Sequence, residues 1–170
     1  MAKMNKRDTF YFWYLLIHIP VAFFIDCSLV VPRQFLLPVQ KYMVDLHVGA
    51  NKDFLLQSPP LWLQYFGMFE MLFQLPLFFL ASYHLWRGSK SVLVVVAIYG
   101  FNAFFTTGVC LLYVLTEGAN NGLSESEVWN LFGLYVPYFV IPLAMMIDCT
   151  YRAMRLIQEG QRAIEAKKKL

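Results

Sequence analysis

Charged side chains are scarce in this chain of 170 residues. Asp, Glu, Lys and Arg make up 15% of it, whereas hydrophobic residues make up 59% and aromatic residues 18%. A soluble domain of this size could not bury so much apolar surface, so lipid must solvate much of the chain. The net charge is only +3, and the basic residues gather at the two ends and beside one short loop. These features predict an integral membrane protein and argue against a nucleic-acid-binding surface.

Cysteine is equally rare. Cys27, Cys110 and Cys149 are far apart, lie inside or at the ends of apolar runs, and lack the spacing of a metal site. We interpret them as small buried hydrophobic residues, and we expect neither a metal ion nor a cofactor.

Four apolar runs are long enough to be membrane spans. At about 1.5 Å of rise per residue, a helix of 20 or so residues crosses a hydrocarbon core of roughly 30 Å. We therefore predict an all-α, integral membrane four-transmembrane-helix bundle over residues 1–157, followed by a basic tail over residues 158–170. The first run follows basic residues like a signal peptide, but it is too long and lacks a small-residue cleavage site, so we predict a retained span. The predicted spans are residues 9–31, 61–86, 92–115 and 128–150.

The connections between these runs differ in character. Residues 32–60 mix proline, glycine and charge, which predicts an ordered loop with short elements over one end of the bundle. Only residues 89–91 separate the second and third spans, so we expect an antiparallel pair there. Residues 116–127 form an acidic loop rich in Gly and Asn.

Lys and Arg are distributed unevenly over the two ends of the predicted bundle. The end with both termini has eleven of them, whereas the other end has three. The positive-inside rule then predicts that both termini are cytosolic. Lys167 and Lys168 stand fourth and third from the last residue, as in a dilysine retrieval signal, which predicts a multi-pass protein of the endoplasmic reticulum membrane. A Lys-rich end could instead bind anionic lipid headgroups.

Acidic side chains at membrane depth are the strongest indication of function. Glu70 stands near the middle of the second span, Asp26 near the outer end of the first, and Asp53 in the loop on that same side. An ionisable group within the membrane costs at least a few kcal/mol and normally faces the protein interior or a wet cavity. The three acids therefore predict a site for an amphipathic molecule.

Structural roles remain open for several of these side chains. Asp26 could pair with Arg33, seven residues later on the same helical face. Glu70 and Gln74 could form a hydrogen-bonded clasp between helices. His18 lies about 80° from Asp26 on a helical wheel, so it can face the same interior, as a satisfied core histidine or as a site residue.

Other polar side chains of the predicted spans are interpreted as structural. Asp148 is expected to pair with Arg152, one helical turn later. Tyr135 and Tyr138 are typical of core aromatic residues, although Tyr138, which follows Pro137, could line a pocket.

Several segments carry a resemblance to a known family. They are HIPVAFFID (residues 18–26), KDFLLQSPPLW (52–62), FEMLFQLPLFFLASY (69–83) and YVPYFVIP (135–142). In this order and spacing they resemble the sigma-2 receptor family of the EXPERA superfamily, over about residues 10–150. The resemblance implies a four-helix membrane protein of the endoplasmic reticulum that binds sterols or cationic amphiphilic molecules in a cavity, contacts membrane lipid and forms a homodimer.

The same resemblance implies which residues bind the ligand. The family's two ligand-pairing aspartates, its membrane acid with a glutamine, and its pocket threonine and tyrosine all have counterparts here. The chain departs from the family pattern in residues 41–51 and in the acidic loop. The implied residues are Asp26, Asp53, Glu70, Gln74, Thr107 (with Thr106 as the alternative) and Tyr138, to which we add His18.

Three functions are compatible with these residues. The expected one is a non-enzymatic receptor-like protein with a role in sterol or lipid homeostasis. A second is a sterol Δ8-Δ7 isomerase like the emopamil-binding branch of the superfamily, with Glu70 and either His18 or Asp26 as acid and base. The chain resembles the receptor branch and shows no matching isomerase arrangement of His and Glu. A third is an adaptor or chaperone for membrane proteins or mitochondrial precursors that uses the acidic loop or the tail.

Overall fold

The computed structural model describes residues 4–168, and within this range it contains helices and turns but no β-strand. The all-α class is therefore confirmed. Lys3 and Lys169, which entered the charge count, lie outside the described residues. The helical segments are α1 (Lys6–Phe24), η1 (Asp26–Leu29), η2 (Arg33–Phe35), α2 (Pro38–Asn51), α3 (Phe54–Gln57), α4 (Leu61–Phe69), η3 (Glu70–Gln74), α5 (Leu75–Trp86), α6 (Val92–Glu117) and α7 (Glu125–Lys168).

Three helical stretches of the described chain are long and apolar enough to cross a membrane: Leu61–Trp86, Val92–Glu117 and Glu125–Lys168. The first two match the predicted second and third spans, and the last passes position 158 without a break. α1 is not among them, because its 19 residues begin with three charged ones and end at Phe24 instead of the predicted residue 31. Asp26 consequently begins the 3₁₀ turn η1 and does not belong to the first long helix.

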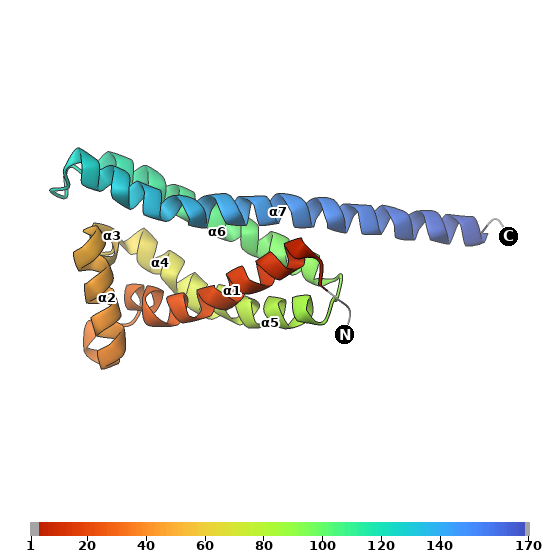
Figure 1. The fold of residues 1–170 in the computed structure, drawn as a ribbon, viewed down its shortest axis with the longest axis horizontal. Coiled ribbons are helices and arrows are strands. Elements are labelled where there is room, and N and C mark those ends of the chain that lie inside the picture. The colour runs from red at the N-terminus through yellow and green to blue at the C-terminus, as the bar shows by residue number, and fades with distance from the viewer. Residues whose placement is uncertain (1–3, 169–170) are drawn as a thin grey trace.

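The long helices run roughly along one direction, and α2 crosses one end of them (Figure 1). α1 begins and α7 ends at the same end of the molecule. α6 packs chiefly on α7, and α1 chiefly on α5. The predicted second and third spans are thus neighbours in the chain but not main packing partners. The segment of residues 32–60 covers the opposite end of the bundle, as predicted.

Two glycines allow close approaches that shape the bundle. A Cβ at Gly100 would lie 2.6 Å from the carbonyl oxygen of Pro142, so α6 and α7 can approach this closely only without a side chain there. A Cβ at Gly67 would lie 2.7 Å from the Cβ of Leu29, which seats η1 against α4. The second contact matters for function because η1 carries Asp26.

Two clusters of buried apolar side chains occupy the two halves of the bundle. One joins α1, α5, α6 and α7 around Leu15, Phe78 and Met145. The other joins α3, α4, α6 and α7 around Leu55 and Leu131. In lipid the hydrophobic effect does not drive helices together, so close packing and polar links between helices must stabilise the bundle.

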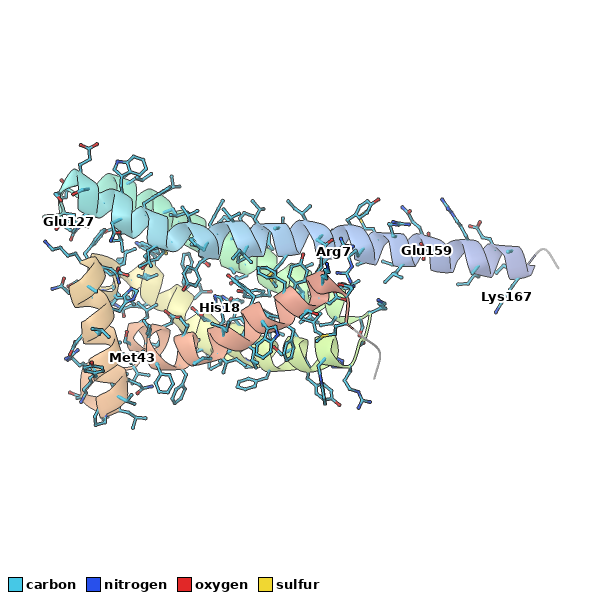
Figure 2. The ribbon with its side chains drawn as sticks, in the orientation of Figure 1. Arg7, His18, Met43, Glu127, Glu159 and Lys167 are labelled. Carbon is cyan, nitrogen blue, oxygen red and sulfur yellow. The ribbon has the colours of Figure 1, made fainter. Side chains whose placement is uncertain are left out.

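A group of charged side chains supplies one such link, between the start of α1 and the C-terminal half of α7. Arg152 lies 3.1 Å from Asp148, which confirms the predicted pair. Arg7 also contacts Asp148, at 2.6 Å, and Asp8 contacts Arg152, at 2.7 Å. Figure 2 shows Arg7 beside α7. The predicted local pair is thus the centre of an ion-pair network that joins two helices.

Candidate functional site

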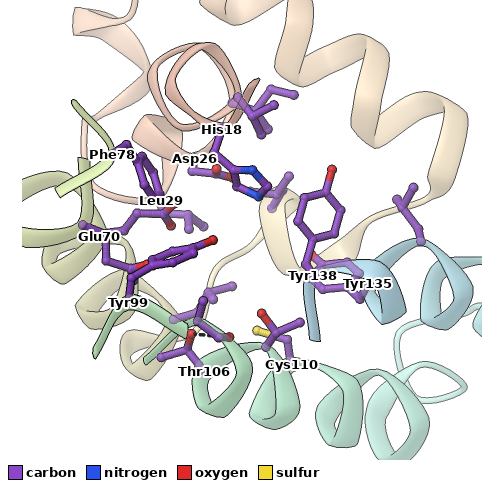
Figure 3. Close-up of a pocket in the computed structure, with 18 of the residues that line it drawn as sticks. His18, Asp26, Leu29, Glu70, Phe78, Tyr99, Thr106, Cys110, Tyr135 and Tyr138 are labelled. Carbon is purple, nitrogen blue, oxygen red and sulfur yellow. Dashed lines mark hydrogen bonds between the residues drawn. The ribbon is translucent and has the colours of Figure 1, made fainter. Parts of the chain in front are cut away.

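A cavity of about 280 Å³ lies between the helices. Residues from both buried clusters line it, so it interrupts the apolar interior at the middle of the bundle (Figure 3). Its lining residues are Tyr14, His18, Val21, Ile25, Asp26, Leu29, His47, Leu56, Leu63, Glu70, Gln74, Phe78, Tyr99, Ala103, Thr106, Thr107, Cys110, Leu134, Tyr135 and Tyr138.

Most of the predicted site residues meet in this cavity. They come from segments far apart in the sequence, namely α1, η1, η3, α6 and α7. Asp53 does not line it, although residues that contact Asp53 do. The predicted residues that line the cavity are His18, Asp26, Glu70, Gln74, Thr107 and Tyr138.

Glu70 and Gln74 lie on a π-helical turn, η3, where the sequence predicted a regular helix. The N–H of Leu75 donates to the carbonyl of Glu70, five residues earlier. Pro76 follows and has no N–H to continue the α-helical pattern, which accounts for a distortion at this point. π-turns inside helices occur frequently at functional sites. Gln74 donates a hydrogen bond to Asn102 of α6 at 2.6 Å. The predicted hydrogen bond between helices is therefore present for Gln74. No hydrogen bond of the Glu70 side chain is found within residues 4–168.

Asp26 also faces the cavity. The alternative pairing with Arg33 is wrong, because Arg33 binds both carboxylate oxygens of Asp45 at 2.8 Å. The described chain offers no hydrogen bond or ion pair to the Asp26 carboxylate. Ending α1 at Phe24 turns Asp26 out of the helical ladder and toward the cavity.

Asp53 has the opposite surroundings. It is fully buried and caps α3, where one carboxylate oxygen accepts hydrogen bonds from the N–H groups of Leu55 and Leu56. The other oxygen accepts the Tyr135 hydroxyl at 2.9 Å and lies 3.1 Å from Nε2 of His47. Protein groups therefore occupy the carboxylate. Its contribution to the cavity is to position Tyr135 and His47.

His18 forms part of an aromatic wall. Its Nδ1 lies 2.8 Å from the carbonyl oxygen of Tyr14. Since a carbonyl only accepts, Nδ1 carries a proton and Nε2 remains for another partner. The ring packs 4.2 Å from Tyr14 and 5.4 Å from Tyr138, measured between centroids. Both interpretations of His18 therefore hold in part: one nitrogen is satisfied, and the ring lines the cavity.

The two neighbouring threonines of α6 differ in availability. The Thr106 hydroxyl donates to the carbonyl oxygen of Asn102 in its own helix at 3.0 Å. No bond of the Thr107 hydroxyl is found in the described part of the chain. Both line the cavity, but Thr107 retains a free donor for a ligand.

A second cavity, of about 360 Å³, lies between α1 and α7. It shares Tyr14, His18, Leu134 and Tyr138 with the first, so these residues form the wall between the two spaces. A Cβ at Gly133, which also lines it, would meet no atom within 4 Å. The second space therefore opens toward the side of the bundle.

Sequence reasoning missed several lining residues. His47 lies in a region treated as a loop, yet Gln40, Val44 and His47 follow the spacing of one helix face, which was the available signal. Tyr135 was interpreted as a core aromatic residue, but it reaches both Asp53 and the cavity. Nothing in the local pattern distinguishes it from other tyrosines of the spans.

The chemistry of the cavity combines carboxylates with an apolar and aromatic wall. No Lys or Arg is among the described lining residues, whereas Asp26 and Glu70 both are. Apolar walls with a few convergent polar groups are typical of small-molecule sites. Carboxylates are suited to charge-assisted hydrogen bonds with a cationic head.

Three membrane-length helices around an acid-containing cavity define a helical membrane protein with a candidate ligand site. Residues 35–149 match the family model of EXPERA, the expanded EBP superfamily, and the chain belongs to this family. It is 32% identical over 158 residues to efficient mitochondria targeting-associated protein 19 of Saccharomyces cerevisiae, covering 85% of this chain and 98% of that protein. It is 34% identical over 144 residues to sigma intracellular receptor 2 of Homo sapiens, covering 79% of this chain and 81% of that protein.

Proposed function

We propose that the chain is a non-enzymatic, receptor-like membrane protein that binds a sterol or a cationic amphiphilic molecule in the acid-containing cavity and acts in sterol or lipid homeostasis. The observation that carries the proposal is that Asp26 and Glu70 face an apolar cavity while no residue of the described chain pairs with either. Polar groups in a protein interior are normally hydrogen-bonded, so two carboxylates that are accessible only to a cavity in the bundle favour a partner from outside the chain. The similarity to sigma intracellular receptor 2 supports the same conclusion.

The arrangement suggests how such a ligand would bind. Its polar head would contact Asp26 and Glu70, with Gln74 and Thr107 within the same wall. Its apolar body would lie against the aromatic wall that includes Tyr138. At about 280 Å³ the first cavity is slightly smaller than the range of about 300–1,000 Å³ that is typical of ligand pockets. A sterol-sized ligand would reach the second cavity, between α1 and α7, by displacing side chains of the shared wall, such as His18 and Tyr138.

The proposal includes a membrane arrangement. α1 would be a fourth, shorter span, since its apolar residues 9–24 reach about 24 Å at 1.5 Å each. α1 begins and α7 ends at the same end of the bundle, which supports placing both in the cytosol under the positive-inside rule. Lys167 and Lys168 support residence in the endoplasmic reticulum membrane. A homodimer is proposed from the family resemblance alone.

The decisive experiment replaces Asp26 by Asn in the full chain, purified in lipid nanodiscs, and measures binding of a radiolabelled cationic amphiphile. A charge-assisted hydrogen bond contributes about 1.5–3 kcal/mol, so affinity should fall roughly 10- to 150-fold. Asp45→Asn is the matched control, because Asp45 is an exposed acid paired with Arg33 outside the cavity. Equal affinity for Asp26→Asn and the parent would remove the proposed ion pair.

An isomerase is a second candidate, because one cavity contains two carboxyl groups and a histidine nitrogen that no group of the described chain engages. Glu70 could protonate an alkene, and His18 or Asp26 could accept the proton that the carbocation loses. Incubating the purified protein with a Δ8-sterol and analysing the products separates the two functions. Conversion to the Δ7 product would overturn the non-enzymatic proposal.

A third candidate is an adaptor for mitochondrial precursors or membrane proteins, favoured by the similarity to efficient mitochondria targeting-associated protein 19. The exposed end of α7, residues 151–168, would be its handle. Truncation after residue 157 keeps Arg152 and its ion pairs but removes most of this segment. A binding protein should retain ligand affinity after this truncation, whereas an adaptor that works through the tail should lose its partner.

A further inference from the structure

α2 is an unusual helix in this bundle because it does not run with the others. Its 14 residues are about 21 Å long, too short to cross a bilayer. Figure 1 shows it lying across the end of α1 and α4. If the long helices cross the membrane, α2 lies parallel to the membrane plane.

One face of α2 is fixed to the bundle. Gln40 donates to the carbonyl of Phe23, at the end of α1, at 2.8 Å, and contacts the sulfur of Cys27, in η1, at 3.2 Å. Val44 is 6% exposed, and His47 contacts Asp53. These residues, spaced four and three apart, form the inward face.

The rest of α2 is divided between apolar and charged side chains. Val39, Tyr42 and Leu46 are 48%, 65% and 54% exposed, and they lie within about 60° of one another on the helix. Lys41 and Asp45 occupy another face, where Asp45 pairs with Arg33. The inward, apolar and charged faces of α2 therefore each take up about a third of the helix circumference. Phe35 and Leu37, which precede the helix, are also exposed, at 71% and 51%.

We propose that the apolar face of α2, formed by Val39, Tyr42 and Leu46, docks on lipid in the interfacial region of the bilayer. An amphipathic helix that lies in the membrane plane buries its apolar side chains at the boundary between headgroups and acyl chains. Isolated exposed apolar residues need no explanation, but a contiguous exposed face marks an interaction surface.

Two observations favour lipid over a protein partner. The charged side chains are confined to a different face, where headgroups and water can solvate them. Tyrosine, as at position 42, is enriched at membrane interfaces. Because α2 also carries His47, this docking would hold one wall of the cavity at the membrane surface.

Spin labels on introduced cysteines test the proposal in the full chain reconstituted into phosphatidylcholine vesicles. Tyr42→Cys and Leu46→Cys place labels on the apolar face, and Lys41→Cys places the matched control on the charged face. The native Cys27, Cys110 and Cys149 are buried, which limits background labelling. The readout is the ratio of collisions with oxygen, which partitions into lipid, to collisions with a water-soluble nickel complex.

We expect this ratio to be several-fold higher at positions 42 and 46 than at 41. Equal ratios at the three positions would overturn the proposal. Protection of 42 and 46 from both reagents would also overturn it, because a protein would then cover the face. Loss of that protection when the protein is diluted with additional phosphatidylcholine would identify the cover as a second copy. If Tyr42→Cys or Leu46→Cys shifts the unfolding midpoint relative to the parent, Val39→Cys, on the same face, is used in its place.

Discussion

The carboxylate of Asp53 accepts hydrogen bonds from two backbone N–H groups and a tyrosine hydroxyl and contacts a histidine ring, whereas the carboxylate of Glu70 faces a cavity and has no hydrogen bond within residues 4–168. Both acids lie inside the bundle, but only the first is satisfied by the chain. A polar group without a hydrogen-bonding partner in the protein interior lowers the stability of the fold. Such a group is therefore expected where it serves a function other than stability. The difference therefore separates an acid that stabilises the fold from one that is available to a ligand.

The comparison also shows how the two regions depend on each other. Asp53 holds Tyr135 and His47, and both line the cavity that Glu70 faces. The satisfied acid thus shapes the site without entering it. Substitutions at Asp53 and its partners should consequently lower the free energy of unfolding, whereas substitutions at Glu70 should lower the affinity for a ligand.

The largest expected effect is on stability, from Asp53→Ala. The substitution removes the acceptor of several buried hydrogen bonds, so the free energy of unfolding should fall by roughly 3–5 kcal/mol. Denaturant unfolding in detergent measures it. Asp45→Ala is the control, since an exposed pair contributes only about 0–1 kcal/mol. Equal losses for the two variants would contradict the structural role of Asp53.

A smaller loss is expected from Tyr135→Phe, which removes only the hydroxyl that donates to Asp53 at 2.9 Å. A hydrogen bond to a charged acceptor contributes about 1.5–3 kcal/mol, so the unfolding free energy should fall by that amount. Tyr138→Phe is the matched control, because no hydrogen bond of the Tyr138 hydroxyl is found in the described chain. If both variants unfold alike, the bond from Tyr135 does not stabilise the protein.

Glu70→Gln should affect ligand binding more than stability, the reverse of the substitutions around Asp53. The substitution is nearly isosteric and breaks no hydrogen bond of the described chain, so the unfolding free energy should change by less than about 1 kcal/mol. Affinity for a cationic amphiphile should fall at least about tenfold. The pair of measurements is informative: a large loss of stability with unchanged affinity would make Glu70 another structural acid.

Much of this arrangement was predictable from the sequence. Hydropathy placed the helices Leu61–Trp86 and Val92–Glu117 within two residues of their ends, because long apolar runs have few alternatives in lipid. The rarity of acids at membrane depth singled out Glu70 and Asp26, and the family resemblance assigned Tyr138 to the pocket. All three line the cavity.

The remaining features depend on contacts that no local pattern encodes. The π-turn at Glu70 comes from one changed backbone hydrogen bond beside Pro76, and apolar periodicity does not report such a change. Arg33 had two acids within reach, and the fold of residues 32–51 selected Asp45 over Asp26. Asp53 was expected in the site, but burial and the start of α3 made it a helix cap.

The smallest effect is expected from the ion pair between Lys52 and Glu127, which lies next to Asp53 at the surface and joins the α2 end to the start of α7 at 2.5 Å. The hydrogen bond from Lys52, with further ones from Ser124, lowers the pKa of Glu127 from its ordinary 4.5 to about 2. Since the pKa is lower in the folded state, the stabilisation is fully present above pH 4.5 and is lost as the pH falls toward 2. The pair is exposed, so salt and solvent keep the effect small.

We expect the difference in unfolding midpoint between the parent and Glu127→Gln to shrink over this pH range. Glu125→Gln, which replaces an exposed acid two residues earlier, is the control and should show no such convergence. A pH-independent difference for Glu127→Gln would mean that the ion pair with Lys52 does not stabilise the region around Asp53.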